Sequence, residues 1–329
     1  MLRPGRTLLL AAAVAAVLAG NAYAHPGLGT AGALGSAPSA RGVASLSAET
    51  MLGGVGVSCY GRVPTITGTE AGEEILGTDG PDVIAALGGD DVIRGLGGRD
   101  LICPGEGNDE AYGGAALDNL EASPGDDLID GGPGQDFVGH YDSPAPVVVD
   151  LAAGTSTGWG SDTLASVEGV VGSLFADEIF GRSGPDQLEG RAGADLIDGR
   201  GGHDLLYGDA GSDRFRGGKG FDYVSYWTSP RGVRADLSRG RATGDGTDTF
   251  RQIEGLGGSR FADVLIGNRR TNGLYGEPGN DRLLGLGGRD GLFGNAGRDR
   301  LDGGAGYDLG NGGRGTDTCV RIEVRRSCP

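Results

Sequence analysis

Aspartates recur every nine residues along three long stretches of the chain, each just after a glycine-rich turn. Asp91, Asp100 and Asp109 show this spacing, and each lies two residues after a glycine. A short carboxylate side chain, held beside backbone carbonyls that a glycine turn can point inward, offers oxygen ligands only. A hard divalent cation such as calcium takes about six to eight oxygen ligands. The spacing therefore predicts a row of cation sites.

The nine-residue period is continuous over residues 68–139, 172–225 and 258–320. These ranges divide into 21 slices, with Asp at the sixth place in 19 and glycine at the fourth place in 16. The eighth place is Ile, Leu, Val or Phe in 18 slices. Three residues after the aspartate suffice for a minimal strand whose middle side chain points inward. A fixed short period of this kind predicts a solenoid of stacked coils.

The repeat G-G-x-G-x-D-x-apolar-x resembles the repeats-in-toxin (RTX), or hemolysin-type calcium-binding, nonapeptide. The resemblance implies an all-β fold, a parallel β-roll solenoid in which two slices complete one turn and calcium lies between stacked turns. Slices that contain Glu73, Ala116, Phe175, Phe261 or Asn272 depart from the pattern and are expected to bind calcium weakly or not at all. The predicted calcium ligands are Asp82, Asp91, Asp100, Asp109, Asp127, Asp136, Asp186, Asp195, Asp204, Asp213, Asp222, Asp281, Asp290, Asp299, Asp308 and Asp317.

Composition limits the kind of core and the kind of partner. Of 329 residues, 70 are glycine and only 6% are aromatic, so no large globular core can form. Ordering this chain costs more conformational entropy than its few inward side chains return, and calcium binding is therefore predicted to drive folding. The formal net charge of −17 lacks the basic footprint that nucleic acid requires. The predicted partner is calcium, with no nucleic acid.

The first 24 residues have the pattern of a signal peptide. Arg3 and Arg6 precede an apolar run that ends at an Ala22-Tyr23-Ala24 cleavage site. No other apolar run reaches the roughly 18 residues that a membrane span needs. These features predict a secreted protein without a membrane span.

Four cysteines, an even number in a chain predicted to be exported, predict disulfide bonds. Three connectivities are possible. We favour Cys59–Cys103 with Cys319–Cys328, because each pair closes one end of the repeat array. Four free thiols are the alternative.

Two segments of equal length separate the repeat blocks and match each other at an offset of 86 residues. Each reads as a strand followed by turns, which predicts a wider coil of the same solenoid. Residues 320–324 alternate like an edge strand, which predicts a C-terminal cap; a basic patch that docks on the cell envelope is the alternative. The predicted division is signal peptide 1–24, flexible leader 25–57, N-terminal cap and first block 58–139, spacer 140–171, second block 172–225, spacer 226–257, third block 258–320 and C-terminal cap 321–329.

No group of residues predicts catalysis. The chain has neither an H-E-x-x-H zinc motif nor a G-x-S-x-G nucleophile elbow. His140, Tyr141 and Asp142 lie together, but residues 226–228 of the second spacer differ, so packing is favoured over catalysis. The sequence thus predicts a non-enzymatic, exported calcium-binding protein with no catalytic or cofactor-binding residues. The alternatives are a calcium-stiffened adhesin or toxin-like surface protein, and a polysaccharide-active enzyme whose site includes Asp162 or Glu168.

Overall fold

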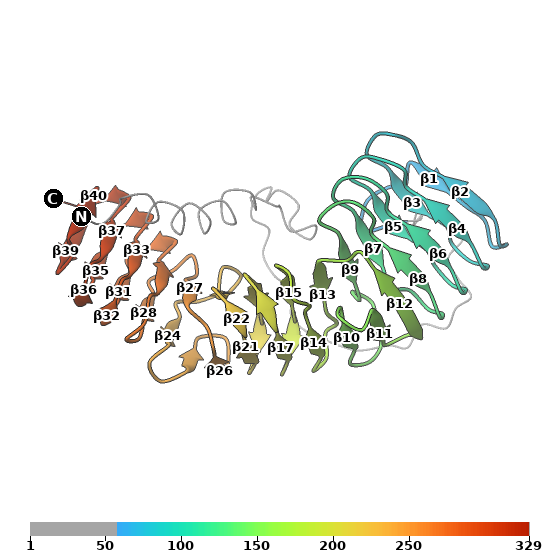
Figure 1. Cartoon of the computed structure of the whole chain (residues 1–329). Coiled ribbons are helices and arrows are strands. Elements are labelled where there is room, and N and C mark those ends of the chain that lie inside the picture. The colour runs from blue at the N-terminus through green and yellow to red at the C-terminus, as the bar shows by residue number, and fades with distance from the viewer. Residues whose placement is uncertain (1–57, 329) are drawn as a thin grey trace, which may run out of the picture.

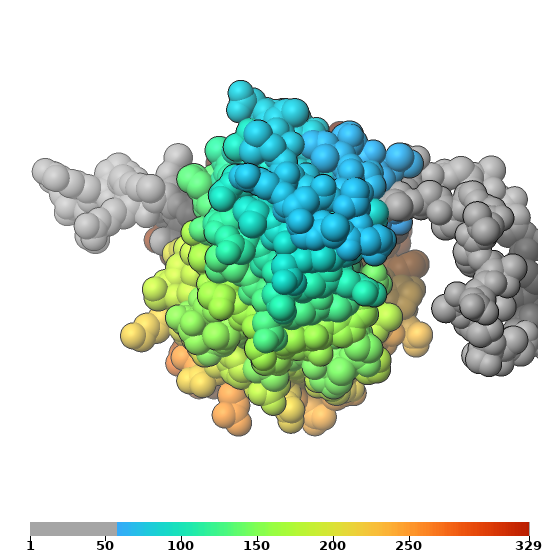
Figure 2. Space-filling model, turned by 90° about the vertical axis from the view of Figure 1, so that its right-hand side faces the viewer, coloured from blue at the N-terminus to red at the C-terminus, as the bar shows by residue number. Residues whose placement is uncertain are grey.

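The computed structural model describes residues 58–328, which form strands, turns and loops. The predicted signal peptide (1–24) and leader (25–57) lie outside the described residues. Figure 1 shows a solenoid bent into an arc, with the two ends of the described chain at opposite tips. Figure 2 faces the N-terminal end, where the first coils lie outermost and the later coils follow the bend below them. None of the described residues form a helix that could cross a membrane.

Two long sheets run the length of the solenoid, the 14-strand sheet on the inner side of the arc and the 17-strand sheet on its outer side (Figure 1). The 14-strand sheet contains β1 (Ile66–Thr67), β3 (Val83–Ala85), β5 (Leu101–Cys103), β7 (Asn119–Glu121), β9 (Phe137–Gly139), β13 (Gly169–Val171), β15 (Gln187–Glu189), β19 (Leu205–Tyr207), β23 (Tyr223–Ser225), β27 (Gly255–Gly257), β29 (Gly273–Tyr275), β33 (Gly291–Phe293), β37 (Leu309–Asn311) and β40 (Val324–Arg326). The 17-strand sheet contains β2 (Glu74–Leu76), β4 (Val92–Arg94), β6 (Glu110–Tyr112), β8 (Leu128–Asp130), β10 (Val148–Asp150), β11 (Thr155–Thr157), β12 (Ser161–Ala165), β14 (Glu178–Phe180), β17 (Leu196–Asp198), β21 (Arg214–Arg216), β24 (Arg234–Asp236), β25 (Arg241–Thr243), β26 (Thr247–Arg251), β28 (Val264–Ile266), β31 (Arg282–Leu284), β35 (Arg300–Asp302) and β39 (Thr318–Val320).

Parallel strands within the repeat blocks pair at an offset of 18 residues, which is two slices. Ile84 lies opposite Ile102 in the 14-strand sheet, and Ile93 lies opposite Ala111 in the 17-strand sheet. Successive slices therefore alternate between the sheets and two slices complete one turn, which confirms the β-roll prediction. Glycine loops also stack, through the short strands β16 (Ala192–Gly193), β18 (Gly201–Gly202), β20 (Ala210–Gly211), β22 (Lys219–Gly220), β30 (Pro278–Gly279), β32 (Gly287–Gly288), β34 (Ala296–Gly297), β36 (Ala305–Gly306) and β38 (Arg314–Gly315).

The core lies between the two sheets and consists largely of eighth-place side chains. Ile84, Ile102 and Leu283 are fully buried, and one contiguous apolar cluster extends from Ile75 to Ile322. This cluster passes through both spacers, so apolar packing is continuous along the arc. Successive coils are therefore coupled by direct side-chain contact as well as by backbone hydrogen bonds.

Each spacer widens one coil of the same solenoid, as predicted. In the first spacer β12 pairs in parallel with β8, β10 and β11 continue antiparallel from it, and β10 pairs in parallel with β14. The second spacer repeats the arrangement with β26, β25 and β24 between β21 and β28. Both sheets thus remain continuous across the spacers. The division into three blocks stays a prediction.

The predicted disulfides close both ends of the described chain. Cys59 is bonded to Cys103, with their Cα atoms 5.7 Å apart, and Cys319 is bonded to Cys328, at 5.8 Å. This confirms the favoured connectivity over free thiols.

The prediction of one edge strand over residues 320–324 was wrong. β39 ends at Val320, and the edge strand β40 (Val324–Arg326) belongs to the other sheet. Arg321 breaks the strand with a φ of 48°, and its guanidinium pairs with Asp302 at 2.6 Å. The turn places the buried Ile322 beside Gly310, whose missing side chain leaves space in the core. Ile322 thus fills the core beside a glycine, and the chain then enters the 14-strand sheet, where β40 pairs with β37.

Candidate metal centres

The sixth-place side chains turn inward and stack in two columns, one leading into each long sheet. The Asp82 N–H donates to Asp100 Oδ1 (2.9 Å), and the Asp100 N–H donates to Asp118 Oδ1 (2.9 Å). In the other column the Asp91 N–H donates to Asp109 Oδ1 (2.8 Å). One oxygen of each of these carboxylates therefore accepts a hydrogen bond from the backbone of the preceding turn, 18 residues earlier in the chain.

Acids outside the repeat pattern continue these columns through the spacers and into the C-terminal cap. The Asp136 N–H donates to Glu168 Oε2 (3.0 Å), and the Asp127 N–H donates to Asp162 Oδ1 (3.2 Å). Glu254, Asp248 and Glu323 accept the equivalent bonds. The nine-residue pattern does not include these residues, so it does not predict their place in the columns. The signal was present in the spacers, because Asp162/Asp248 and Glu168/Glu254 are paired across the duplication.

In many slices the second carboxylate oxygen is buried without a hydrogen-bond partner. Among the described residues these oxygens are the Oδ2 atoms of Asp91, Asp100, Asp109, Asp118, Asp136, Asp195, Asp204, Asp222, Asp281, Asp290, Asp299, Asp308 and Asp317. We call the glycine-rich loops that contain these aspartates the open loops. Asp118 belongs to this group although its slice was expected to bind weakly. A buried charged oxygen without a partner is costly, so each open loop calls for a positive group.

In other slices the loop satisfies its own carboxylate. The Thr78 N–H donates to Asp82 Oδ2 (2.7 Å), and the Ser173 and Ser259 N–H groups donate in the same way to Asp177 (2.6 Å) and Asp263 (2.7 Å). We call these the closed loops. They are the slices whose sixth-place residues are Glu73, Asp82, Asp177, Asp186, Asp263 and Asn272. These are the first two slices of each block.

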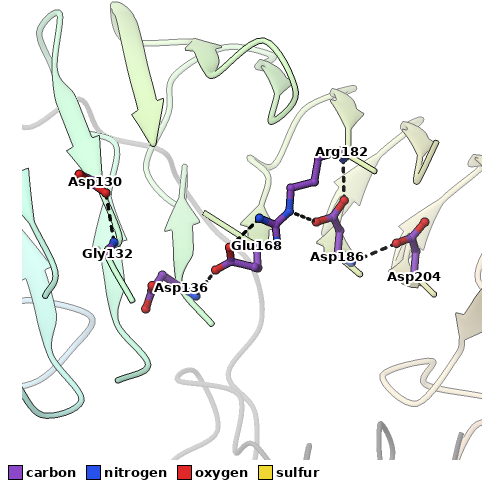
Figure 3. A network of polar contacts seen from close by, with 7 residues as sticks. All are labelled: Asp130, Gly132, Asp136, Glu168, Arg182, Asp186 and Asp204. Carbon is purple, nitrogen blue, oxygen red and sulfur yellow. Dashed lines mark hydrogen bonds and ion pairs between the residues drawn. The ribbon is translucent and has the colours of Figure 1, made fainter. Parts of the chain in front are cut away.

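The closed loop of Asp186 also contains its own cation (Figure 3). Arg182 Nε lies 2.8 Å from Asp186 Oδ1, and Arg182 Nη1 lies 2.7 Å from Glu168 Oε1. The guanidinium thus bridges the last acid of the first spacer and the second slice of the next block. At this junction, where the repeat pattern is interrupted, the Arg182 side chain neutralises the carboxylates of Glu168 and Asp186.

The remaining predicted ligands fit neither class fully. Asp127 Oδ2 accepts a bond from the Ser123 hydroxyl at 3.3 Å. Asp213 Oδ1 accepts a bond from the Asp195 N–H at 2.9 Å, as in the columns elsewhere. Both residues are buried.

The open loops offer an oxygen-only donor set. A methyl carbon placed on Gly95 would lie 2.4 Å from both Asp100 Oδ2 and Gly113 O, so a carboxylate and a carbonyl of the next turn converge there. The same convergence occurs at Gly285, between Asp290 Oδ2 and Gly303 O. Among residues 58–328 no three His, Cys, Asp or Glu side chains are placed so that they could hold one metal ion together, so a cation here would take most of its ligands from backbone carbonyls. This donor chemistry fits calcium.

Burial disfavours the charged form of the open-loop carboxyls. Desolvation, with added repulsion from Asp118 and Asp82, raises the pKa of Asp100 to about 6. Desolvation with repulsion from Asp222 raises the pKa of Asp204 to about 8. Desolvation with repulsion from Asp263 raises the pKa of Asp281 to about 8. A bound divalent cation would counteract both effects, because its positive charge favours the ionised carboxylates.

Of the three residues that could have suggested catalysis, His140 and Tyr141 are packed into the structure and Asp142 is exposed. His140 is 2% exposed, and desolvation lowers its pKa to about 4. The Tyr141 ring makes an edge contact with Tyr60 at a centroid distance of 5.2 Å. These contacts favour packing over a catalytic role.

Comparison with known families decides the identity of the repeat. The family model of the RTX calcium-binding nonapeptide repeat matches residues 67–102, 76–111, 104–138, 171–206, 197–224, 257–292 and 290–319, together more than half of the chain. The chain belongs to the RTX calcium-binding repeat family. No curated protein matches it. The matched ranges contain both open and closed RTX loops, so family membership alone does not say which loops hold an ion.

The raised pKa values predict that acid partly replaces calcium in the RTX array. A carboxyl whose pKa is raised on folding contributes stability that is fully present below its ordinary value near 3.8 and is lost as the pH rises through about 6 to 8. In excess chelator, the β-sheet circular dichroism signal should therefore be larger at pH 5.5 than at pH 8. In calcium, affinity should fall over the same acidification because protons compete. A chelated β signal that grows from pH 5.5 to pH 8 would contradict this.

Proposed function

We propose that this protein is an exported, non-enzymatic RTX β-roll whose folding is driven by calcium bound between stacked loops. The observation that carries the proposal is the set of thirteen buried aspartate oxygens without a partner, arranged in columns through the solenoid. Calcium would neutralise these carboxylates and join each loop to the next turn. Coupling of this kind makes the binding free energy part of the folding free energy.

We further propose that calcium occupies the open loops, whereas the closed loops need no ion. Of the predicted ligands, Asp82 and Asp186 then hold structure without calcium, since backbone N–H groups and Arg182 already satisfy them. Asn272 supports this assignment, because a neutral residue occupies a closed position and donates from Nδ2 to Glu254 O at 3.2 Å. Each block thus begins with two loops that can form without bound calcium.

Two features support the non-enzymatic part of the proposal. Asp162 and Glu168, the candidates for an enzymatic site on a spacer, turn inward and accept column hydrogen bonds. Glu168 also forms an ion pair with Arg182 at 2.7 Å. Export is supported by the pattern of residues 1–24 and by the two disulfides, which persist in oxidising compartments.

One pair of substitutions tests the assignment of calcium to the open loops. Asp100→Asn removes the charge of an open loop and keeps Oδ1 for the Asp82 N–H. We expect isothermal titration calorimetry to show fewer bound calcium ions and an affinity at the altered sites weaker by about tenfold or more.

The matched control is Asp82→Asn, one turn away in the same column, which imitates Asn272 in a closed loop. It should leave calcium stoichiometry unchanged. Equal losses in the two variants, or no loss with Asp100→Asn, would overturn the division into open and closed loops.

A further inference from the structure

The outer surface of the C-terminal half of the 17-strand sheet is lined with arginine. We call this surface, from β21 to β35, the arginine face. All of its arginines are exposed, and they alternate along their strands with buried core residues such as Phe215, Leu283 and Leu301. They therefore share one side of the sheet. They are Arg214, Arg216, Arg234, Arg241, Arg251, Arg282 and Arg300.

The register of the sheet places several of these guanidinium groups in one row. Arg234 lies opposite Val264, Val264 opposite Arg282, and Arg282 opposite Arg300. Neighbouring strands are about 4.8 Å apart, so Arg282 and Arg300 lie side by side on adjacent strands and Arg234 lies two strands from Arg282, across Val264. Exposed threonines lie beside these arginines, Thr243 on β25 and Thr318 on β39, the strand next to β35.

Acids do not neutralise this face. Asp236 is bonded to the Ser238 hydroxyl and to Arg239, and Asp302 is held by Arg321. Within the described chain Arg216 forms an ion pair, at 3.4 Å with Asp198, and the other six arginines form none. These six charges are free to meet an external partner.

The negative net charge of the whole chain gives no indication of this basic surface. Residues 214–329 carry 19 Lys and Arg against 14 Asp and Glu, whereas residues 1–213 carry 9 against 31. Ten of those 14 acids are buried, mostly in the columns. The acids therefore act inside the solenoid and the arginines outside it.

The shape and chemistry of the face select among possible anionic partners. It lies on the outer, convex side of the arc (Figure 1), so a second rigid copy of the chain would touch it over a short length only. Its outward residues on β21, β24–β26, β28, β31, β35 and β39 include no aromatic side chain, which removes the stacking that single-stranded nucleic acids use. Arginine beside threonine suits a polymer that carries both anionic groups and hydroxyls.

We propose that the arginine face binds a linear acidic polysaccharide, along the row that Arg234, Arg282 and Arg300 form. A flexible chain can follow the convex sheet and pair its sulfate or carboxylate groups with successive guanidinium groups. This is an activity separate from the binding of calcium, which takes place inside the coils.

The test is a binding titration in saturating calcium with fluorescent dextran sulfate and hyaluronate, and with uncharged dextran as the blank. The triple variant Arg234→Gln/Arg282→Gln/Arg300→Gln should raise Kd at least tenfold and flatten its salt dependence. The matched control Arg289→Gln/Arg298→Gln/Arg314→Gln removes three exposed loop arginines outside the face and should change Kd less than threefold. Both variants should keep the wild-type circular dichroism spectrum, because all six side chains are exposed.

Binding of dextran sulfate alone would assign sulfate as the recognised group, and binding of both polymers would assign anionic charge in general. Equal loss in the two triple variants would overturn the proposal in favour of unspecific attraction. Tighter binding of a single-stranded oligonucleotide than of either polysaccharide would overturn the assigned partner. Absence of binding by folded, calcium-loaded protein would overturn the proposal and leave the calcium function untouched.

Discussion

Chelation of calcium is expected to abolish most of the β-sheet circular dichroism signal of residues 25–329 at pH 8, and restoring calcium should return it cooperatively. The reason is the columns of buried carboxylates, thirteen of which have an oxygen without a partner. Each such oxygen costs about 1–3 kcal/mol or more. A few of them therefore outweigh the net stability of about 5–15 kcal/mol that is typical of a domain.

The transition should lie near millimolar calcium, as in other extracellular modules. Magnesium is the control, because it demands a tighter octahedral shell and should restore little of the signal. The disulfides should be kept intact, so that loss of signal reports on metal alone. A fully structured protein in excess chelator at pH 8, with no bound ion, would contradict calcium-driven folding.

Gly288→Ala is expected to destabilise the calcium-loaded protein by about 2–4 kcal/mol. Gly288 occupies the fourth place of its slice with a φ of 122°. A Cβ there would lie 2.3 Å from Arg270 O, the carbonyl of the turn below. The substitution therefore strains the backbone and separates two loops that must stack. Urea denaturation in saturating calcium should show the loss as a lower midpoint.

Gly287→Ala, at the adjacent position, is the matched control. A Cβ on Gly287 would meet Ala305 O at 3.4 Å, which is ordinary contact, and its φ is not in the left-handed range. Neighbouring slices already carry Ala296 and Ala305 at this third place. The control should change the stability by less than about 1 kcal/mol. Comparable losses in both variants would show that glycine content, and not loop contact, limits stability.

The nine-residue pattern was sufficient to predict a solenoid, and its resemblance to the RTX nonapeptide predicted the β-roll; the assignment of calcium ligands stays a prediction. In a coil of this length the apolar eighth-place side chain and the acidic sixth-place side chain can each point inward in one way only. The orientation of residues such as Ile102 and Asp100 could therefore be assigned without coordinates. The cysteine pairing followed from the ends of the array. These features depend on contacts that repeat identically from coil to coil, and a repeat in sequence records them directly.

Several features could not be predicted because they depend on contacts that occur once. Whether a carboxylate oxygen is free depends on the second-place N–H of the same loop, as the contrast between Asp82 and Asp100 shows. The break at Arg321 depends on the space beside Gly310. Glu168 lies in its column because of the register of the spacer, and Arg182 pairs with its carboxylate there.

The sequence alone determined that this chain is an RTX solenoid with inward aspartates, because a strict period leaves each side chain a single face. Only the tertiary structure decided which of those aspartates still need a cation, since that depends on the few N–H groups, and on the guanidinium of Arg182, that reach them. It also separated the buried acids from the exposed arginines. Net charge sums both groups, whereas a partner in solution meets only those at the surface.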